Sequence, residues 1–351
     1  MKKIARFFAL PMLLMIILFL YGNNLIFTGA NAAGILFARP QKEPPQSDSA
    51  VPPTQEDNAF AAPESATGFD SPFKDFALPK NTPLYDTDYP IAEMTYAPAL
   101  NSITYQRQNC YVKNMTKLSK GEVETQLLAP LDFEVEKDSP QPQILIMHTH
   151  ATESYDNHPE PFYDPEYTCR SLDTSLNMVS VGAIIAKQLN LLGYNTLHDD
   201  TLHDHPSYNA SYGRSKATVQ DYLEKYPSIK IVLDIHRDAI ERKDGTRIKP
   251  VITLQNKKYA QVMIICGADN GYLNMPNYKK NLRFASHLQN SMETLYPGFT
   301  RPLLFDYRNY NQQLSTGSLL IEVGSHANTL EEAQNSAKLI AYSLAKMFER
   351  V

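Results

Sequence analysis

The stretch Ile144–Tyr155, "ILIMHTHATESY", places a group of reactive side chains directly after an apolar run. Four apolar residues lead into His148 and His150, and Glu153 follows three positions after the second histidine. A short apolar run of this length predicts a buried strand. The polar residues that follow it either bind a metal or only cap the strand by bonding to backbone groups.

Further strand patterns alternate with helical patterns on the C-terminal side of this stretch. The predicted strands are Ile144–Met147, Tyr194–Leu197, Ile229–Ile235, Val262–Cys266 and Leu319–Val323. The predicted helices are Asn177–Leu192, Tyr212–Tyr226, Tyr278–Tyr296 and Leu330–Phe348. This alternation predicts an α/β fold with a mostly parallel sheet flanked by helices on both faces.

The N-terminal third of the chain has a different composition. Three basic residues precede Phe7–Leu20, which carries no charge, so residues 1–32 are predicted to be a cytoplasmic tail and transmembrane anchor. A cleaved signal peptide ending near Ala32 is the alternative. Residues 33–104 are rich in Pro and Ser and are predicted to be a disordered linker. Residues 105–351 form the predicted catalytic domain, outside the cytoplasm.

Charge and cysteine content exclude several classes of protein. The formal net charge of the 351 residues is -5, and no basic stripe with interleaved aromatic residues is present, which argues against nucleic acid as a partner. The three cysteines, Cys110, Cys169 and Cys266, are widely spaced. They provide neither a disulfide framework nor a C-x-x-C metal site.

Polar residues at the ends of two predicted strands have the composition of a zinc site. His150 and Glu153 have the spacing H-x-x-E, and His236 lies in the third strand within "DIHRDA". Two histidines and one carboxylate, with water in the fourth position, are the ligands of an open catalytic zinc site. His148 is the alternative first ligand, because residues two apart on an extended strand point to the same side.

Further candidates lie near the fifth strand. Glu322 interrupts the apolar run "LLIEVGS", and a carboxylate in such a run usually has a partner or a function, here that of a general base. The alternative is a buried ion pair with an arginine. The predicted substrate-binding residues are Arg237, Arg308, Asn311 and Gln312. The loop "LHDDTLHDHPSY" is rich in His and Asp, but a proline-containing loop after a strand more often uses these residues for turns and caps.

Four blocks in the C-terminal part carry a family resemblance. They are "ILIMHTHATESY", "LHDDTLHDHPSYNASYGRS", "VLDIHRDAI" and "YNQQLSTGSLLIEVGSHANTLEEA", in this order behind an apolar N-terminus. They resemble the stage II sporulation protein P family over roughly residues 105–351. The family's histidine after the first strand maps to His148 or His150, its strand-three histidine to His236 and its late glutamate to Glu322.

The resemblance implies a zinc amidase fold and a zinc-dependent N-acetylmuramoyl-L-alanine amidase of peptidoglycan that acts during engulfment of the forespore. Endopeptidase activity on stem peptides, a metallocarboxypeptidase, and a wall-binding protein without catalysis are the alternatives. The resemblance also implies a location at the septal or engulfing cell membrane. It further implies a complex with a sporulation lytic transglycosylase and a membrane scaffold subunit.

Overall fold

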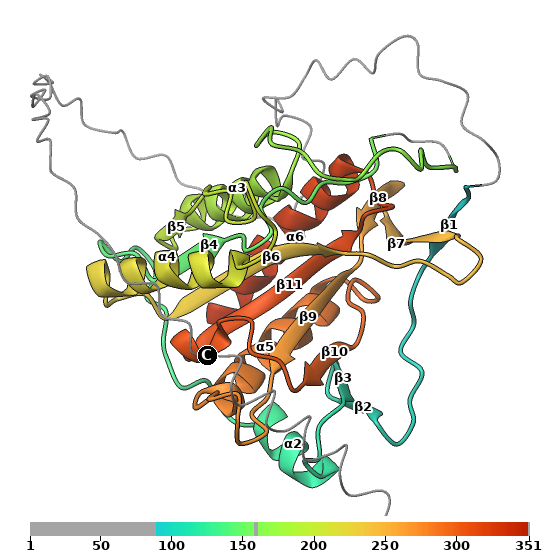
Figure 1. Cartoon of the computed structure of the whole chain (residues 1–351). Helices are drawn as coiled ribbons and strands as arrows, with labels where there is room; N and C mark the ends of the chain where they lie inside the picture. Colours follow the sequence, from blue (N-terminus) through green and yellow to red (C-terminus); the bar gives the residue numbers. More distant parts are fainter. Residues whose placement is uncertain (1–88, 158–160, 350–351) are drawn as a thin grey trace, which may run out of the picture. The chain divides into compact units, whose positions relative to one another are not determined.

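A large mixed sheet runs through the part of the chain that the computed structural model describes, residues 89–157 and 161–349 (Figure 1). Its eight strands lie in the order β2-β3-β10-β9-β11-β6-β4-β5. Their bounds are Thr104–Arg107 (β2), Cys110–Asn114 (β3), Ile144–Met147 (β4), Thr196–His198 (β5), Ile231–Asp238 (β6), Val262–Gly267 (β9), Leu303–Asp306 (β10) and Gly317–Ser325 (β11). The pairs β2–β3 and β9–β11 are antiparallel and the other neighbours are parallel, which confirms the predicted mostly parallel sheet.

A smaller sheet of three strands contains part of the predicted linker. β1 (Ile91–Met94) pairs in parallel with β7 (Arg247–Leu254), and β7 pairs with β8 (Lys257–Ala260). Residues 91–104 are therefore part of the folded region and not of a disordered linker. The predicted anchor at 1–32 and linker residues 33–88 lie outside the described residues. Within the described part of the chain, no helix is long and apolar enough to span a bilayer.

Helices cover the two faces of the large sheet unequally. The helices are α2 (Lys120–Leu127), α3 (Met178–Leu191), α4 (Ser211–Lys225), α5 (Tyr278–Leu295) and α6 (Leu330–Phe348), with a short 3-10 helix, η1 (Gln312–Leu314). Apolar side chains of α3, α5 and α6 form the main core with one face, through strand residues such as Ile235 and Ile321. On the other face, α4 packs Val219 against Val232 and Met147, in front of the sheet in Figure 1.

Local capping signals explain where several helices begin and end. The Asn177 side chain accepts a hydrogen bond from the Val179 amide at the start of α3. Gly193, with φ of 87°, follows the end of this helix in the left-handed conformation that glycine favours. The side chains of Thr329 and Glu332 form a capping box at the start of α6. These signals confirm the two predicted helices to within one residue.

The strands that sequence patterns did not predict lie mainly in the peripheral regions. β10 and β8 have four residues each, and β7 contains Pro250 and two basic residues, so none shows a clear strand pattern.

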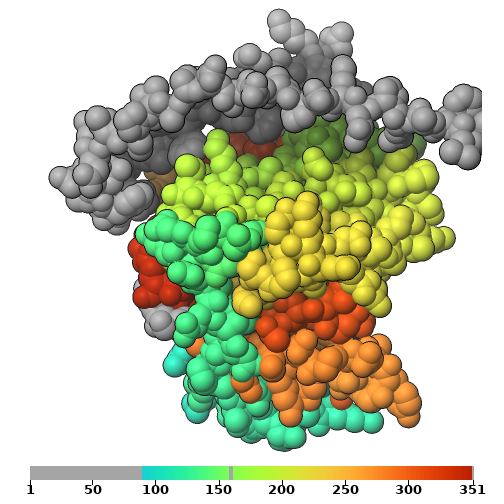
Figure 2. Space-filling view, turned by 90° about the vertical axis from the view of Figure 1, so that its left-hand side faces the viewer, coloured from blue at the N-terminus to red at the C-terminus, as the bar shows by residue number. Residues whose placement is uncertain are grey.

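Figure 2 shows the green segment that includes α2 lying against the orange segment of α5. The Ser286 hydroxyl, for example, donates to the Leu127 carbonyl oxygen at 2.9 Å. Long-range contacts of this kind hold the peripheral elements in place.

Candidate active site

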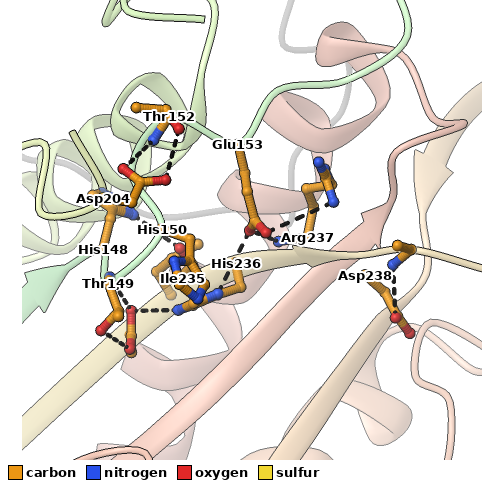
Figure 3. A network of polar contacts seen from close by, with 12 residues as sticks. His148, Thr149, His150, Thr152, Glu153, Asp204, Ile235, His236, Arg237 and Asp238 are labelled. Carbon is orange, nitrogen blue, oxygen red and sulfur yellow. Dashed lines mark hydrogen bonds and ion pairs between the residues drawn. The ribbon is translucent and has the colours of Figure 1, made fainter. Parts of the chain in front are cut away.

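Polar side chains meet at the carboxyl ends of three neighbouring strands, β4, β6 and β11. Figure 3 shows those of the turn after β4 and of β6. β4 and β11 both pair in parallel with β6, so the residues that follow or end these strands come together at one edge of the sheet. Glu322 on β11 is the register partner of His236 on β6, so the two side chains share one face. The residues of this site are His150, Glu153, Asp234, His236 and Glu322.

His148 and His150 point to opposite faces of the sheet. β4 ends at Met147, and the chain then turns, so the alternation of an extended strand no longer applies. His148 contacts the Ile235 carbonyl oxygen at 2.9 Å through Nδ1 and His198 Nε2 at 3.0 Å through Nε2. The His150 ring lies instead against His236, with ring centroids 5.2 Å apart, and against Tyr212 of α4.

His236 lies between two carboxylates. Its Nε2 is 2.8 Å from Asp234 Oδ1, and its Nδ1 is 3.5 Å from Glu153 Oε2. Burial by itself would lower the pKa of His236, but the charges of Asp234 and Glu153 raise it well above its usual value. Asp234 is fixed in turn by Thr149, whose amide and hydroxyl donate to its two oxygens at 2.8 and 2.7 Å.

The charge states of the other two predicted ligands also follow from their surroundings. Burial favours the neutral form of Glu153, but a contact with His236 and the charge of Arg237 outweigh it and lower the Glu153 pKa to about 2. Burial lowers the pKa of His150, and the neighbouring His236 lowers it further. Glu153 is therefore ionised and His150 neutral at pH 7, and these are the forms that bind metals. His236, whose pKa is raised, would release its proton on binding a metal.

The donor set fits zinc in composition, and one pair fits it in spacing. Two donors each about 2.1 Å from one tetrahedral zinc lie roughly 3.4 Å apart. The 3.5 Å between His236 Nδ1 and Glu153 Oε2 agrees with this separation. The contact of Asp234 with the opposite ring nitrogen resembles the carboxylate–histidine–zinc arrangement of metalloenzymes. In residues 89–157 and 161–349, however, no three His, Cys, Asp or Glu side chains are already arranged to hold an ion.

Glu322 is a half-buried residue whose carboxylate has an unused oxygen. Its Oε2 is buried and has no hydrogen-bond partner in the described part of the chain. Burial raises the pKa of Glu322 to about 8; the charge of His236 acts against this rise, and Asp238 and Glu153 add to it. β11 then has a register shift between Glu322 and Ser325, where Gly324 has a φ of 69°. A Cβ at Gly324 would lie 2.4 Å from Asn328 Oδ1, so the chain turns here only with glycine.

The four predicted substrate-binding residues occupy different environments. Arg237 is buried and donates to the carbonyl oxygens of Ser154 and Cys169. Gln312 is buried and bonds to the backbone of Gly267 and Ile265. Because their polar groups are already used inside the protein, substrate contact does not fit these two residues.

The other two lie closer to solvent. Asn311 donates to the Tyr212 carbonyl oxygen at 2.8 Å and to the Ser215 hydroxyl at 3.1 Å, which joins η1 to α4. Arg308 pairs with Asp306 at 3.0 Å, and its side chain is 41% exposed. Arg308 is therefore the member of this set that has room to contact a substrate.

The His- and Asp-rich loop after β5 supports the turn that carries Glu153. Asp204 accepts hydrogen bonds from the Thr152 amide and hydroxyl, at 3.1 and 2.6 Å, and pairs with Arg170 at 2.9 Å. His203 Nδ1 lies 2.8 Å from the His148 carbonyl oxygen. Tyr208, from the same loop, stacks on the His150 ring with centroids 4.4 Å apart. The loop thus positions the proposed ligands, in agreement with the turn-and-cap interpretation.

Two supporting residues, Asp234 and Arg170, were missed by sequence reasoning. Asp234 stands in the apolar run "IVLDIH", where a charged group is as costly as Glu322 is in its own apolar run, so the same signal was present. Arg170 carries no such signal. It reaches Asp204 and, at 3.7 Å, Glu153 across 34 and 17 positions of sequence, a contact that only the folded chain creates.

Two sequence comparisons relate this chain to a known family. A model of the stage II sporulation protein P family matches residues 80–345. The stage II sporulation protein P of Bacillus subtilis (strain 168) is 31% identical over 218 residues, which cover 58% of this chain and 51% of the relative. The chain thus spans about half the length of this curated relative.

Solved structures with a similar arrangement of elements include two from amidases. The CwlD amidase of Clostridioides difficile, in complex with the GerS lipoprotein, is 10% identical with a TM-score of 0.36, over 59% of this chain and 97% of that one. The N-acetylmuramoyl-L-alanine amidase AmiC2 of Nostoc punctiforme is 12% identical with a TM-score of 0.34, over 60% and 97%. Similarity at this level carries no functional argument. The family match, in contrast, spans most of the chain, and the chain therefore belongs to the stage II sporulation protein P family.

Proposed function

We propose that this chain is a zinc-dependent N-acetylmuramoyl-L-alanine amidase that hydrolyses the amide between the lactyl group of muramic acid and L-alanine in peptidoglycan. The observation that carries the proposal is the placement of Glu322. This residue has a buried, unpaired carboxylate oxygen and is the register partner of His236, beside a second histidine and a second carboxylate. Family membership and the resemblance of its sequence blocks support the same reaction.

His150, Glu153 and His236 would hold the zinc ion in this proposal. Zinc would supply polarisation of the scissile carbonyl and a lowered pKa of the attacking water. Asp234, at 2.8 Å from His236 Nε2, holds this ring so that Nδ1 faces Glu153. Arg170 and Arg237, each 3.7 Å from Glu153 Oε1, stabilise its ionised form. Tyr208 stacked on His150 excludes water from one side of that ring.

Glu322 carries the proton-transfer role. In the ionised form of Glu322, which the charge of His236 favours, the free carboxylate oxygen accepts a proton from the attacking water and returns it to the alanine nitrogen as the amide bond breaks. The C–N bond is thereby replaced by a carboxylate on the lactyl group and a free amine on the peptide. The register pairing with His236 keeps this carboxylate on the face where His150 also lies.

Product analysis tests this reaction directly. The zinc-loaded chain is incubated with purified peptidoglycan, and the soluble products are identified by mass spectrometry after labelling of free amines. Release of stem peptides with a free N-terminal L-alanine is expected. Products with new amines only inside the stem peptide would identify an endopeptidase instead, and intact peptidoglycan that binds the chain would identify a wall-binding protein.

The proposal includes a location and partners. A hydrolase of this class acts outside the cytoplasm, and the predicted anchor would hold it at the septal or engulfing membrane. A complex with a lytic transglycosylase and a membrane scaffold subunit follows from the family resemblance. Isolation of the full-length chain from sporulating cells after crosslinking, followed by identification of the bound proteins, tests both points.

A further inference from the structure

Arg301 is a buried arginine close to Glu322 that no step of the proposed reaction uses. It precedes β10, and its amide donates to the Val262 carbonyl oxygen at 2.8 Å. Its Nη1 donates to Asp238 Oδ2 at 2.8 Å, and Asp238 lies two residues beyond His236 on β6. The charge of Arg301 also acts on Glu322 and lowers its pKa. Arg301 therefore belongs to the same face of the sheet as the candidate active site.

The guanidinium group of Arg301 has one free edge. Its Nη1 is paired with Asp238, and the group lies over the Tyr96 ring, 5.9 Å from the centroid. The remaining donors, Nε and Nη2, are buried and have no hydrogen-bond partner among the described residues. These two nitrogens lie on the same side of the planar group and donate in parallel directions. This is the edge with which arginine binds both oxygens of a carboxylate.

Unpaired buried donors on a charged group are rare in folded proteins. Arg301 is 6% exposed, so bulk water has little access to the guanidinium. Leaving such a donor unpaired costs about 1–3 kcal/mol, and more when the group is charged. A buried unpaired group therefore calls for a ligand or a function.

The neighbourhood of the free edge favours a polar ligand that reaches the active site. Glu322 Oε2 is also buried and unpaired, and no ion pair joins Glu322 to Arg301 in the described part of the chain. The two groups are therefore close without satisfying each other. Asp238 and Met263, the latter paired in register with Glu322, are partly exposed, so solvent reaches the surrounding surface.

We infer that the free edge of Arg301 binds a carboxylate of the peptidoglycan stem peptide and thereby selects substrates that carry it next to the scissile amide. This inference rests on the proposed function, because it takes a muropeptide as the ligand. The D-glutamate that follows L-alanine is joined through its γ-carboxyl, so its α-carboxyl is either a free carboxylate or an amide. Arg301 distinguishes these two forms, since a neutral amide offers a single acceptor oxygen and no charge.

Binding without turnover tests this assignment. The zinc-loaded Glu322→Gln chain is titrated by calorimetry with N-acetylmuramoyl-L-alanyl-D-glutamate and with the matching D-isoglutamine compound, both with the γ-carboxyl blocked as a methylamide so that only the α-position differs. We expect the acid to bind about ten-fold more tightly or better, as for other hydrogen bonds between charged groups. Adding Arg301→Gln should reduce the affinity for the acid to that for the amide. Arg242→Gln, at an exposed arginine, is the matched control and should preserve the discrimination.

Several outcomes would overturn the assignment. Equal affinity for acid and amide in the Glu322→Gln chain would contradict it, as would an equal loss of affinity for both ligands on adding Arg301→Gln. Arg301→Lys keeps the charge but loses the two parallel donors. This variant should fold as the Glu322→Gln chain does and should retain part of the preference for the acid over the amide. If a tripeptide ligand with an amidated D-glutamate and a free diamino-acid carboxylate binds as tightly as the free acid, the bound carboxylate is not that of D-glutamate.

Failure of the inference is distinguishable from failure of the proposed function. The titration measures binding, so it gives a result whether or not the native chain releases peptides with a free N-terminal alanine. A preference for the acid without amidase products would leave Arg301 as a carboxylate-binding residue of a different hydrolase or of a wall-binding protein.

Discussion

His148 and His150 are two residues apart, yet they belong to opposite faces of the sheet and to different kinds of environment. His148 is fully buried on the side of α3, where Gly182 lets the helix approach the ring closely. Burial and the neighbouring His198 lower the pKa of His148 to about 3. His150 lies on the side of α4, among His236, Tyr208 and Tyr212.

The different surroundings of His148 and His150 show that the two faces of the sheet have different roles, one in folding and one in the candidate active site. The face covered by α3, α5 and α6 is filled by apolar side chains, and polar groups there bond to the protein itself. The face that α4 covers leaves the carboxyl ends of β6 and β11 with unpaired polar atoms of Glu322 and Arg301. Groups on the first face should therefore affect folding, and groups on the second should affect metal binding and catalysis.

The largest expected effect is that of Glu322→Gln on activity. Removal of the proposed general base should lower kcat/KM on peptidoglycan by about 10²- to 10⁴-fold while the zinc content stays unchanged. Rates of amine release by the zinc-loaded chain, with metal content from mass spectrometry, check this. Glu331→Gln, at an exposed position on α6, is the control and should leave the rate as it is. A Glu322→Gln chain with more than a tenth of the native rate would remove Glu322 from the mechanism.

The paired variants His150→Ala and His148→Ala separate the two faces directly. His150→Ala should lose at least about ten-fold in zinc affinity, because it removes one of three protein ligands. His148→Ala should keep the zinc but lower the free energy of unfolding by about 1–3 kcal/mol, since Ile235 and His198 lose a buried partner. Zinc titration and urea unfolding measure both. The reverse pattern would make His148 the ligand.

The pH dependence of stability should differ between the native chain and Glu322→Gln in the absence of metal. The pKa of Glu322 rises from an ordinary value of 4.5 to about 8 on folding, because burial disfavours the charged form. The folded state therefore holds the proton more tightly, and the associated stability is present below pH 4.5 and is lost as the pH rises through 8.

Glu322→Gln removes this loss. The free energy of unfolding of the Glu322→Gln chain, relative to that of the native chain, should rise between pH 5 and pH 9, by a few kcal/mol at most. Urea unfolding of both metal-free chains at several pH values measures the difference. If the difference in unfolding free energy between the two chains stays constant over this range, burial does not raise the pKa of Glu322.

A smaller effect is expected from Gly182→Ala on α3. Alanine in place of glycine ordinarily stabilises a helix by about 1 kcal/mol. Here the new Cβ would lie 2.4 Å from His148 Nε2 and 2.9 Å from His198 Nε2, so the free energy of unfolding should fall by about 1–3 kcal/mol. Gly213→Ala on α4 is the matched control, because nothing lies within 4 Å of its Cβ, and it should stabilise the chain. Thermal unfolding of both variants measures this, and equal shifts in melting temperature for Gly182→Ala and Gly213→Ala would contradict the close contact of α3 with His148.

Much of the fold was predictable because its central elements follow simple patterns. β4 and α6 have the predicted bounds, and α3 begins one residue after its predicted start because Asn177 is the N-cap. The missed strands are β1, β2, β3, β7, β8 and β10, because they are short or contain charged residues or proline. In addition, β1 with β7 and β3 with β10 pair between segments far apart in the sequence. The choice between His148 and His150 was not predictable either, since the turn after Met147 ends the strand periodicity on which the choice depended.

The sequence by itself determined the central strands and helices, and it singled out Glu153, His236, Glu322 and one of His148 and His150 as candidate site residues. Those features depend on local periodicity and on the cost of placing charged groups in apolar runs, both of which are visible along the chain. Tertiary structure alone decided that His148 joins the core side, that Asp234 fixes His236, and that Arg301 keeps a free edge near Glu322. Each of these depends on contacts between residues tens of positions apart, whose distances exist only once the sheet has formed.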